Sequence, residues 1–323
     1  MKIKREMIIL KKFILICFCI CFSMGMPLLS INAMPMKDRS VPLMIGIMPD
    51  ADSLPFMFAE TNDYFRNENV LVNLVSFSNP QERDAAIQAG LLDGAISDLL
   101  AAAFLCAGGF DFKVTSLTDG RYGIVASPQS GIKNLADLRG KRIALSTNTI
   151  IQYSVDAQLK AVGVSMEEYE AVAVPRMPLR LEMLLGGMVE AASLPEPLLT
   201  TAVAQGATLL STTDELGIDA GIMLFSKKTL DTRLNDVKAF YRAYYKAAQQ
   251  INADPGACRD YLVEKAGFPE SVRDAYNFVT YRKPGLPANS QINEALAWLK
   301  KRKLLDAELA PTELIDGRAV SEW

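Results

Sequence analysis

Histidine is absent from the 323 residues of the sequence. It is the commonest metal ligand in proteins and the usual general base near neutral pH. The five cysteines include no CxxC pair, so a typical zinc-binding motif is missing as well. These absences exclude Ser-His and Cys-His nucleophile systems and metal hydrolases. We predict no metal and no cofactor, while chemistry based on carboxylates or lysine stays open.

Long apolar runs are missing except near the N-terminus. There a basic start precedes the apolar residues 13–22, and a looser stretch ends at the small residue Ala33. This order is typical of a secretory signal, and the apolar core is short for a membrane span. We predict a signal peptide over residues 1–33, cleaved after Ala33 or, as a second option, after Gly25.

Cysteines are few and give no sign of a disulfide framework. Bulky residues precede the three cysteines of the leader, which disfavours lipidation at Cys17, Cys19 or Cys21. Only Cys106 and Cys258 remain in the mature chain. Two cysteines far apart in sequence are more often buried thiols than a disulfide, so we expect no bond between them.

Positive charge is scarce after the leader is removed. The mature chain keeps 29 basic and 36 acidic residues, a net charge of −7. Binding to nucleic acid needs clustered Lys and Arg to neutralise phosphates. We therefore expect no nucleic-acid partner.

Short apolar runs alternate with helical patterns along the mature chain. Residues 43–48 and 70–77 read as strands, residues 81–89 as a helix, and a further strand begins at Gly94. Strands that alternate with helices predict an α/β fold with parallel sheets and crossover helices. The length of the chain favours about two domains.

One phrase occurs twice. Residues 90–95 read GLLDGA and residues 187–192 read GMVEAA, each after an amphipathic helical pattern. In both, a glycine suits a helix end, and small residues after an acid suit the start of a strand. The repeat predicts two similarly built α/β lobes, with residues 222–225 as a return strand. A later apolar stripe is expected to be core: Val237, Phe240, Tyr241, Tyr244, Tyr245, Ala248 and Ile251.

Four loops rich in short polar residues follow the expected strands. Ligands of open α/β sheets bind beyond the carboxyl ends of strands, where loops lead into helices. In any single loop such residues are more often helix caps, but four loops at one edge favour a shared cleft. The residues predicted to bind ligand are Asp50, Asp52, Ser53, Leu54, Phe56, Ser97, Asp98, Thr147, Asn148, Thr149, Arg176, Pro195 and Glu196.

The charge of the ligand stays open. The loop over residues 146–149 precedes a helix and is suited to an anion, because a helix N-terminus favours negative charge. The acidic residues of the other loops favour an amine, a hydroxyl or a heterocyclic N–H. Arg176 either grips a carboxylate, sulfonate or phosphate or makes an interdomain salt bridge.

Several of these segments together resemble the nitrate/sulfonate/taurine group of ABC-transporter solute-binding proteins, which also includes binders of thiamine-pyrimidine precursors. The segments are YF at 64–65, VLVNLV at 70–75, AG at 89–90, DGA at 93–95, DLRGKRIA at 137–144 and EP at 196–197. Asn69 replaces a glycine that many relatives carry, and asparagine tolerates a left-handed backbone almost as well.

The resemblance implies a type II periplasmic-binding-protein fold, in which two α/β lobes are joined by two hinge crossovers and close around a solute. Lobe I would comprise residues 41–126 and 222–323, and lobe II residues 127–221. The implied protein is an exported monomer, in the periplasm or on the outer face of the cytoplasmic membrane. Its implied partners are a small-molecule solute and an ABC transporter permease.

Two other functions remain open from the sequence. An enzyme on the same fold could use Asp98 or Glu196 as the base of a carboxylate-based lyase or dehydratase. A sensory adaptor could instead report a bound ligand to a membrane kinase.

Overall fold

The computed structural model describes residues 41–219 and 221–323. The predicted signal peptide, its cleavage sites and the leader cysteines lie outside these residues. Within the described ranges, no helix has the length and apolar character needed to cross a membrane.

The first sheet has five strands in the order β2-β1-β3-β10-β4. Strand β1 pairs in parallel with β2 and β3, while β10 is antiparallel to both β3 and β4. The strands are β1 (Leu43–Ile47), β2 (Val72–Ser76), β3 (Gly94–Asp98), β4 (Phe112–Leu117) and β10 (Gly221–Ser226).

The second sheet repeats this topology in the order β7-β6-β8-β5-β9. Strands β6, β7 and β8 are parallel, and β5 is antiparallel to β8 and β9. The strands are β5 (Tyr122–Ala126), β6 (Arg142–Leu145), β7 (Glu170–Ala173), β8 (Ala191–Pro195) and β9 (Thr208–Thr212). Each strand thus has a counterpart in the first sheet, which confirms two similarly built α/β lobes.

The repeated motif, residues 90–95 and 187–192, has the same structural role in both lobes. Gly90 and Gly187 end their helices with the same positive φ of 69°, a conformation that glycine adopts without strain. The acid that follows then accepts a backbone N–H from β1 in the first sheet and from its counterpart β6 in the second. Asp93 Oδ2 lies 2.9 Å from Met44 N, and Glu190 Oε2 lies 3.1 Å from Arg142 N.

Sheet membership places the boundary between the lobes differently from the sequence prediction. Residues 122–126 were expected in lobe I, yet they form β5 in the middle of the second sheet. Gly221 was assigned to lobe II, yet it begins β10 in the first sheet. A strand's partners are set by distant segments, so its apolar sequence does not say which sheet it joins. Below, lobe one denotes the elements of the first sheet and those packed on it, and lobe two those of the second.

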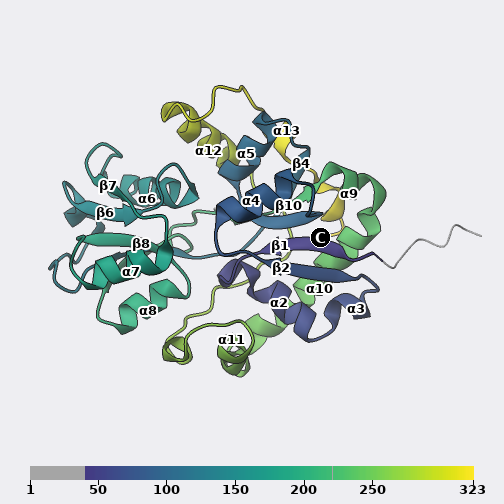
Figure 1. The fold of residues 1–323 in the computed structure, drawn as a ribbon, viewed down its shortest axis with the longest axis horizontal. Helices are drawn as coiled ribbons and strands as arrows, with labels where there is room; N and C mark the ends of the chain where they lie inside the picture. The colour runs from purple at the N-terminus through teal and green to yellow at the C-terminus, as the bar shows by residue number, and fades with distance from the viewer. Residues whose placement is uncertain (1–40, 220) are drawn as a thin grey trace, which may run out of the picture. The chain divides into compact units, whose positions relative to one another are not determined.

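Helices cover both faces of each sheet (Figure 1). In lobe two, α6 covers one face and α7 and α8 the other. In lobe one, α10 packs on α2 and α3, while α5 packs on α12 and α13. The helices are α2 (Leu54–Thr61), α3 (Tyr64–Asn67), α4 (Pro80–Gln88), α5 (Leu99–Ala107), α6 (Ile150–Lys160), α7 (Met177–Leu185), α8 (Leu198–Ala204), α9 (Lys227–Thr232), α10 (Leu234–Ala253), α11 (Arg259–Glu264), α12 (Asn289–Lys301) and α13 (Pro311–Leu314). Five short 3₁₀ turns are η1 (Ala51–Ser53), η2 (Leu135–Leu138), η3 (Gly256–Cys258), η4 (Glu270–Val272) and η5 (Gly317–Ala319).

Helix α10 shows how the sequence pattern becomes a core. Its aromatic stripe lies at helical spacing, and Phe240 and Tyr241 are buried against Phe225 of β10. The predicted core assignment of this stripe is confirmed, with Tyr245 only partly buried at its edge. Asn69 has a φ of 58°, as the prediction for that turn requires.

A buried contact joins the lobes far from the crossovers. The indole Nε1 of Trp298 on α12 donates to Asp156 Oδ2 on α6 at 2.7 Å. Arg302 donates to the same oxygen at 2.7 Å, and Tyr169 donates to Oδ1 at 2.7 Å. Both carboxylate oxygens of Asp156 therefore accept hydrogen bonds, and the donors come from both lobes.

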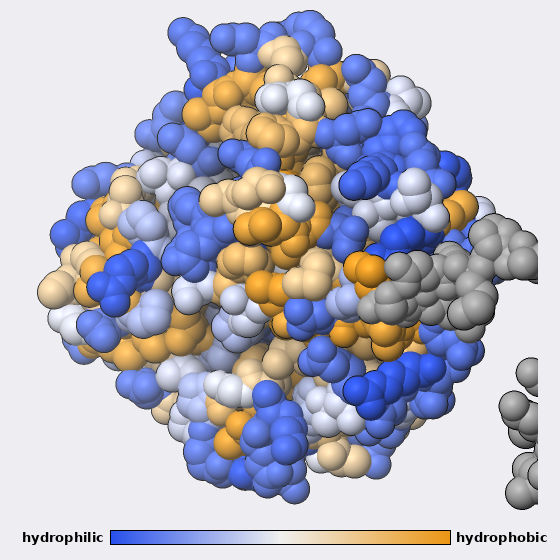
Figure 2. Space-filling model, turned by 45° about the vertical axis from the view of Figure 1, so that its right-hand side comes forward, coloured by the Kyte–Doolittle hydropathy of each residue, from blue (hydrophilic) through white to orange (hydrophobic). Residues whose placement is uncertain are grey.

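The cysteines and the exposed apolar side chains complete the description of the fold. Cys106 and Cys258 are free, as predicted. On the face shown in Figure 2, apolar residues are interspersed with hydrophilic ones. Exposed large apolar side chains come from separate elements, among them Leu91, Phe104, Leu179 and Val203.

Candidate functional site

The two crossovers between the lobes leave each sheet at the edge where its parallel strands end. Gly221 pairs with Asp98 at the end of β3, and Tyr122 pairs with Pro195 at the end of β8. Only residues 118–121 separate β4 from β5, so the two edges lie within roughly 20 Å of each other. This is the edge at which open α/β sheets bind ligands.

The loop after β1 forms a tight hydrogen-bonded turn. Asp50 Oδ1 accepts from the backbone N of Ser53 at 3.2 Å and from its hydroxyl at 3.1 Å. The Ser53 hydroxyl in turn accepts from Met48 N at 3.3 Å. Burial raises the pKa of Asp50 above that of an ordinary aspartate, although these hydrogen bonds oppose the rise. Asp50 and Ser53 therefore cap η1, and Asp50 keeps a second carboxylate oxygen that the turn does not use.

Asp52 lies between the two crossovers. Its carboxylate accepts from Thr118 Oγ1 and packs against Gly120 and Gly221, where any side chain would overlap it. Burial raises the pKa of Asp52 strongly, and the neighbouring Asp50 raises it further. Asp52 is 5% exposed. These contacts make it part of the hinge.

Asp98 ends β3 and begins α5. Its Oδ1 accepts from Ala101 N at 2.9 Å, as an N-cap does. Its Oδ2 lies 4.0 Å from Arg83 Nη2, and the Arg83 charge also acts on Asp50. Burial raises the pKa of Asp98, and Arg83 limits the rise. The charge of Arg83 thus acts on carboxylates of two different loops, Asp98 and Asp50.

Glu196 is the buried acid of lobe two. It is 3% exposed, and its Oε2 accepts from Thr200 N at 3.1 Å. Its Oε1 lies 3.7 Å from Arg121 Nη1 in the first crossover, although Arg121 is held more closely by Asp214 at 2.6 Å. Burial raises the pKa of Glu196, against the effect of Thr200 and Arg121.

Two tyrosines connect these groups electrostatically. Burial raises the pKa of Tyr122, and the charges of Asp52, Asp50 and Asp98 raise it further. Burial likewise raises the pKa of Tyr276, and both Glu196 and Asp50 contribute. Because the interaction between charges weakens with distance, these contributions indicate that acids of both lobes lie near the two tyrosine hydroxyl groups.

The loop before α6 carries the predicted residues of the second lobe. Thr149 is the N-cap: its hydroxyl accepts from Ile151 N at 3.2 Å and donates to Ser146 O at 2.8 Å. Asn148 has a φ of 58° and its N–H donates to the Gln152 side chain at 2.8 Å. Thr147 is half-buried and makes no hydrogen bond within the described chain.

Ser97 and Pro195 occupy the ends of the central strands. Ser97 is 6% exposed, and its hydroxyl has no hydrogen-bond partner among the described residues. Pro195 is buried within β8. Both lie at the crossover edge, but only Ser97 offers an unused polar atom.

Leu54 and Phe56 correct the prediction for the first loop. Each is 1% exposed, and Phe56 stacks on Phe240 and Tyr244 inside lobe one. Both residues lie in the first turn of α2, and the apolar face of this helix packs in the core. They therefore have no surface left to contact a solute.

Arg176 also lies elsewhere than expected. It is exposed at the start of α7. Among the described residues no ion pair includes it, so the salt bridge considered for it is absent, while its contact with a solute stays a prediction. The buried arginine of this region is Arg180, one helical turn later.

Sequence reasoning missed five residues at this edge, which are Arg83, Arg121, Tyr122, Arg180 and Tyr276. For Arg180 a signal existed: it stands four positions before Leu184, and both are fully buried on one face of α7. A charged residue at an apolar helical position marks a buried polar contact. For the others, the partners come from distant segments, so local pattern gave no signal.

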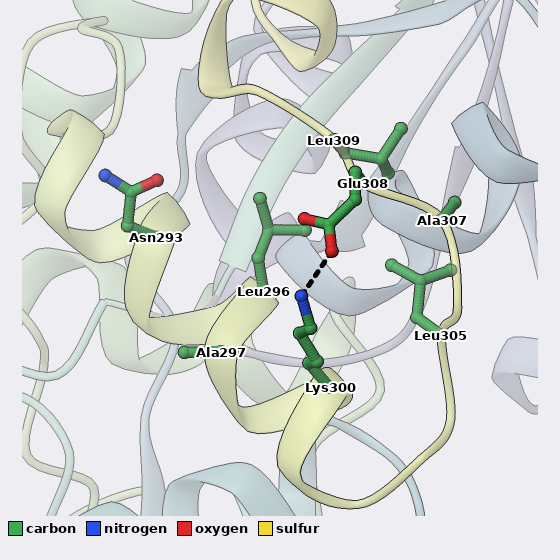
Figure 3. A pocket seen from close by; sticks show the side chains of 8 residues that line it. All are labelled: Asn293, Leu296, Ala297, Lys300, Leu305, Ala307, Glu308 and Leu309. Carbon is green, nitrogen blue, oxygen red and sulfur yellow. Dashed lines mark hydrogen bonds and ion pairs between the residues drawn. The ribbon is translucent and has the colours of Figure 1, made fainter.

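The described residues contain no group of three or more potential metal-ligating side chains. One hollow of 160 Å³ lies between α12 and the loop over residues 305–309 (Figure 3). Lys300 and Glu308 form an ion pair across it. It is smaller than typical ligand pockets of roughly 300–1,000 Å³, and none of the predicted site residues line it.

Comparison with known families agrees with this topology. The family model described as NMT1/THI5 like matches residues 50–258, which is more than half of the chain and includes every predicted site residue. The chain belongs to this family.

A curated relative of this NMT1/THI5-like protein is an ABC transporter periplasmic binding protein of Brachyspira hyodysenteriae. The two are 22% identical over 239 residues, 68% of each chain. Among solved structures, the alkanesulfonate-binding protein SsuA of Xanthomonas axonopodis pv. citri, bound to MOPS, superimposes with a TM-score of 0.70 at 18% identity, over 85% of this chain and 98% of the other.

The desulfurization enzyme DSZB also shares the fold. Its TM-score is 0.63 at 15% identity, over 87% of this chain and 98% of the other. At such identities the structural likeness shows the fold alone. It confirms the type II periplasmic-binding-protein fold, which therefore includes at least one enzyme.

Proposed function

We propose that this protein is an exported solute-binding protein of an ABC import system, which holds a small polar molecule between its lobes and releases it unchanged. One geometric observation carries the proposal: the crossover of residues 118–121 lies against acids of both lobes, since Gly120 packs against the Asp52 carboxylate and Arg121 lies 3.7 Å from Glu196. A solute at this edge would contact both lobes at once. Such two-sided contact is what a hinged binding protein needs to close on its ligand.

The family and the leader support the proposal. The relative from Brachyspira hyodysenteriae is a periplasmic binding protein of an ABC transporter, and the N-terminal pattern of the present chain is that of a secretory signal. The protein would work in the periplasm or at the outer face of the cytoplasmic membrane. It would act as a monomer and deliver its solute to an ABC transporter permease.

The solute would be sulfonate- or taurine-like, or aminopyrimidine-like. The alkanesulfonate-binding neighbour supports the first class. The buried carboxylates of Asp50, Asp98 and Glu196 suit N–H groups of the second. Arg176 stays outside this proposal, because it is exposed at the start of α7.

A carboxylate-based enzyme is the second candidate, because two observations favour it. DSZB is an enzyme on this fold, and burial raises the pKa of Asp98 and of Glu196. Carboxyl groups with raised pKa values are common at catalytic sites. Chemical conversion of a bound compound would distinguish an enzyme from a binding protein.

A thermal-shift screen tests the proposal. The purified protein is melted with sulfonates, aminopyrimidines, purines, amino acids and inorganic oxyanions. A ligand at one hundred times its Kd stabilises by about 2.7 kcal/mol, which raises the melting temperature measurably. We expect one class to do so and to be recovered unchanged. Recovery of a converted compound would establish the enzyme instead, and the absence of any shift with no small molecule in the denatured sample would reject solute capture.

A further inference from the structure

Helix α12 belongs to lobe one but is bonded to lobe two. It packs on α5 and α13 of lobe one, while its Trp298 and Arg302 each donate to Asp156 on α6 at 2.7 Å. The Trp298 ring also meets the Tyr153 ring edge-on, with 5.8 Å between the ring centroids. The crossovers are covalent connections between the lobes, and α12 therefore adds a non-covalent one.

The apolar cores of the two lobes are continuous on the side of this helix. One cluster of buried side chains includes Ala95 and Leu99 of lobe one, Leu145 and Val155 of lobe two, and Trp298 of α12. In Figure 1, α6 and α12 both lie in the upper half of the view. The lobes share a core on this side, so parting them there would expose apolar surface to water, which is unfavourable.

On the opposite side the cores of the lobes are separate. The buried cluster of lobe one around Phe240 is distinct from that of lobe two around Leu199. Here η4 comes close to α8, and Figure 1 shows α8 and α11 in its lower half. Within residues 41–219 and 221–323, no hydrogen bond or ion pair joins η4 to α8. Parting the lobes on this side thus breaks no bond between these two elements and exposes no shared core.

Asp156 adds a polar cost to opening the α12 side. It is 8% exposed, and its Oδ1 accepts from Tyr169 of its own lobe while Oδ2 accepts from Trp298 and Arg302. If α12 left α6, Asp156 would lose two of these three donors. Arg302 would lose the one carboxylate that it contacts in the described part of the chain. Because separating a buried charge from its partner is strongly unfavourable, this contact should persist when the lobes move.

We propose that the contact between α6 and α12 is a fixed pivot: the lobes stay joined there and open only on the opposite side, so that a solute enters and leaves between α8 and η4. Two crossovers alone would allow the lobes to rotate in either direction, and a third contact to one side of them leaves one direction. The inference rests on the proposed function, because it describes how the lobes of a solute-binding protein part. It gives Asp156 and Trp298 a role beyond stability, since they set the direction of opening.

Distances between pairs of spin labels test the direction of opening. Val203→Cys on α8 and Gln249→Cys on α10 form a pair across the side that should open. Lys160→Cys on α6 and Glu294→Cys on α12 form a pair across the joined side. All four positions are exposed and helical, and the two free native cysteines are replaced by alanine.

The labelled protein is unfolded, dialysed free of small molecules and refolded before electron paramagnetic resonance. We expect the α8–α10 distances to be broadly distributed and to extend to long values, because the lobes of a solute-free binding protein open and close. The α6–α12 distances should form one narrow peak.

Two variants weaken the joined side. Asp156→Asn removes the charge that Arg302 contacts, whereas Trp298→Phe keeps an aromatic ring and removes the indole donor. Both should shift the α6–α12 distances to longer values, and Trp298→Phe should do so less because Arg302 still pairs with Asp156. The control is Glu308→Gln, which breaks the exposed ion pair with Lys300 on the same helix and should change neither distribution.

The two distributions decide the matter. A narrow α6–α12 peak beside broad α8–α10 distances, with the peak shifted in Asp156→Asn and Trp298→Phe but not in Glu308→Gln, supports the pivot. Wild-type α6–α12 distances as broad as the α8–α10 distances would overturn the pivot and leave solute capture by hinged lobes standing. Narrow distributions for both pairs in the solute-free wild type would contradict the pivot and hinged capture alike. Variants identical to wild type would show that Asp156 and Trp298 do not hold the lobes together.

Discussion

Four carboxyl groups lie near the crossovers, Asp52 and Glu196 buried and Asp50 and Asp98 partly buried, and burial is the first cause of the raised pKa of each. They differ in what else they touch. Asp98 and Glu196 each have an arginine within 4.0 Å and cap a helix. Asp52 has Asp50 as its charged neighbour and two glycines against its oxygens. We therefore propose that Asp98 and Glu196 contact the solute, while Asp52 stays packed against the crossovers.

The Asp52 carboxyl should make stability fall as pH rises. Its raised pKa means that the folded chain retains a proton that the unfolded chain loses near pH 3.9. Stability is therefore lost between that pH and the raised pKa, by roughly 1.4 kcal/mol for each unit of the rise. Asp52→Asn removes this loss. The free energy of unfolding of the variant should therefore rise relative to that of the wild type as pH increases.

Urea unfolding at pH 4 and pH 8 measures the effect of Asp52. The free energy of unfolding of Asp52→Asn, relative to that of the wild type, should be higher at pH 8 than at pH 4. The exposed Asp306→Asn serves as the control and should show no such trend. A difference for Asp52→Asn that is the same at both pH values would show that the carboxyl does not titrate in this range.

At the scale of elements, helix α12 joins the lobes through one buried acid. Asp156 on α6 is 8% exposed and accepts from Trp298 and Arg302 of α12. A second pair between the same regions, Lys301 with Glu167, is exposed and 3.4 Å apart. Buried charged hydrogen bonds contribute more to stability than exposed ion pairs.

These two pairs give a matched comparison. Asp156→Asn should destabilise the protein by about 1.5–3 kcal/mol, because Arg302 loses its charged acceptor. Glu167→Gln should be indistinguishable from wild type. Denaturant unfolding followed by tryptophan fluorescence measures both. Equal stability of the two variants would show that the buried contact contributes nothing.

The elements also show which features of the fold the sequence could predict. The repeated phrase at residues 90–95 and 187–192 predicted both lobes, because a helix end and a strand start are set by neighbouring residues. The crossovers were misplaced, because β5 joins its sheet through pairing with the distant β8 and β9. Arg180 was missed although it stands four positions before Leu184 on the buried face of α7, a spacing that marks a buried polar contact.

At the scale of the whole molecule, two lobes of one topology are joined by short connections at their carboxyl edges. Asp98 of lobe one and Glu196 of lobe two lie at these edges, each with an arginine within 4.0 Å. The hinge carries Asp52, packed against Gly120 and Gly221.

Native mass spectrometry of residues 34–323, the chain that the predicted cleavage would leave, tests the central claim most directly. The protein is mixed with the compound that raises its melting temperature, and the complex and the released compound are weighed after a day. The account predicts one molecule per chain, with its mass unchanged on release. A released compound of altered mass, or a chain that carries no molecule at saturating concentration, would contradict it.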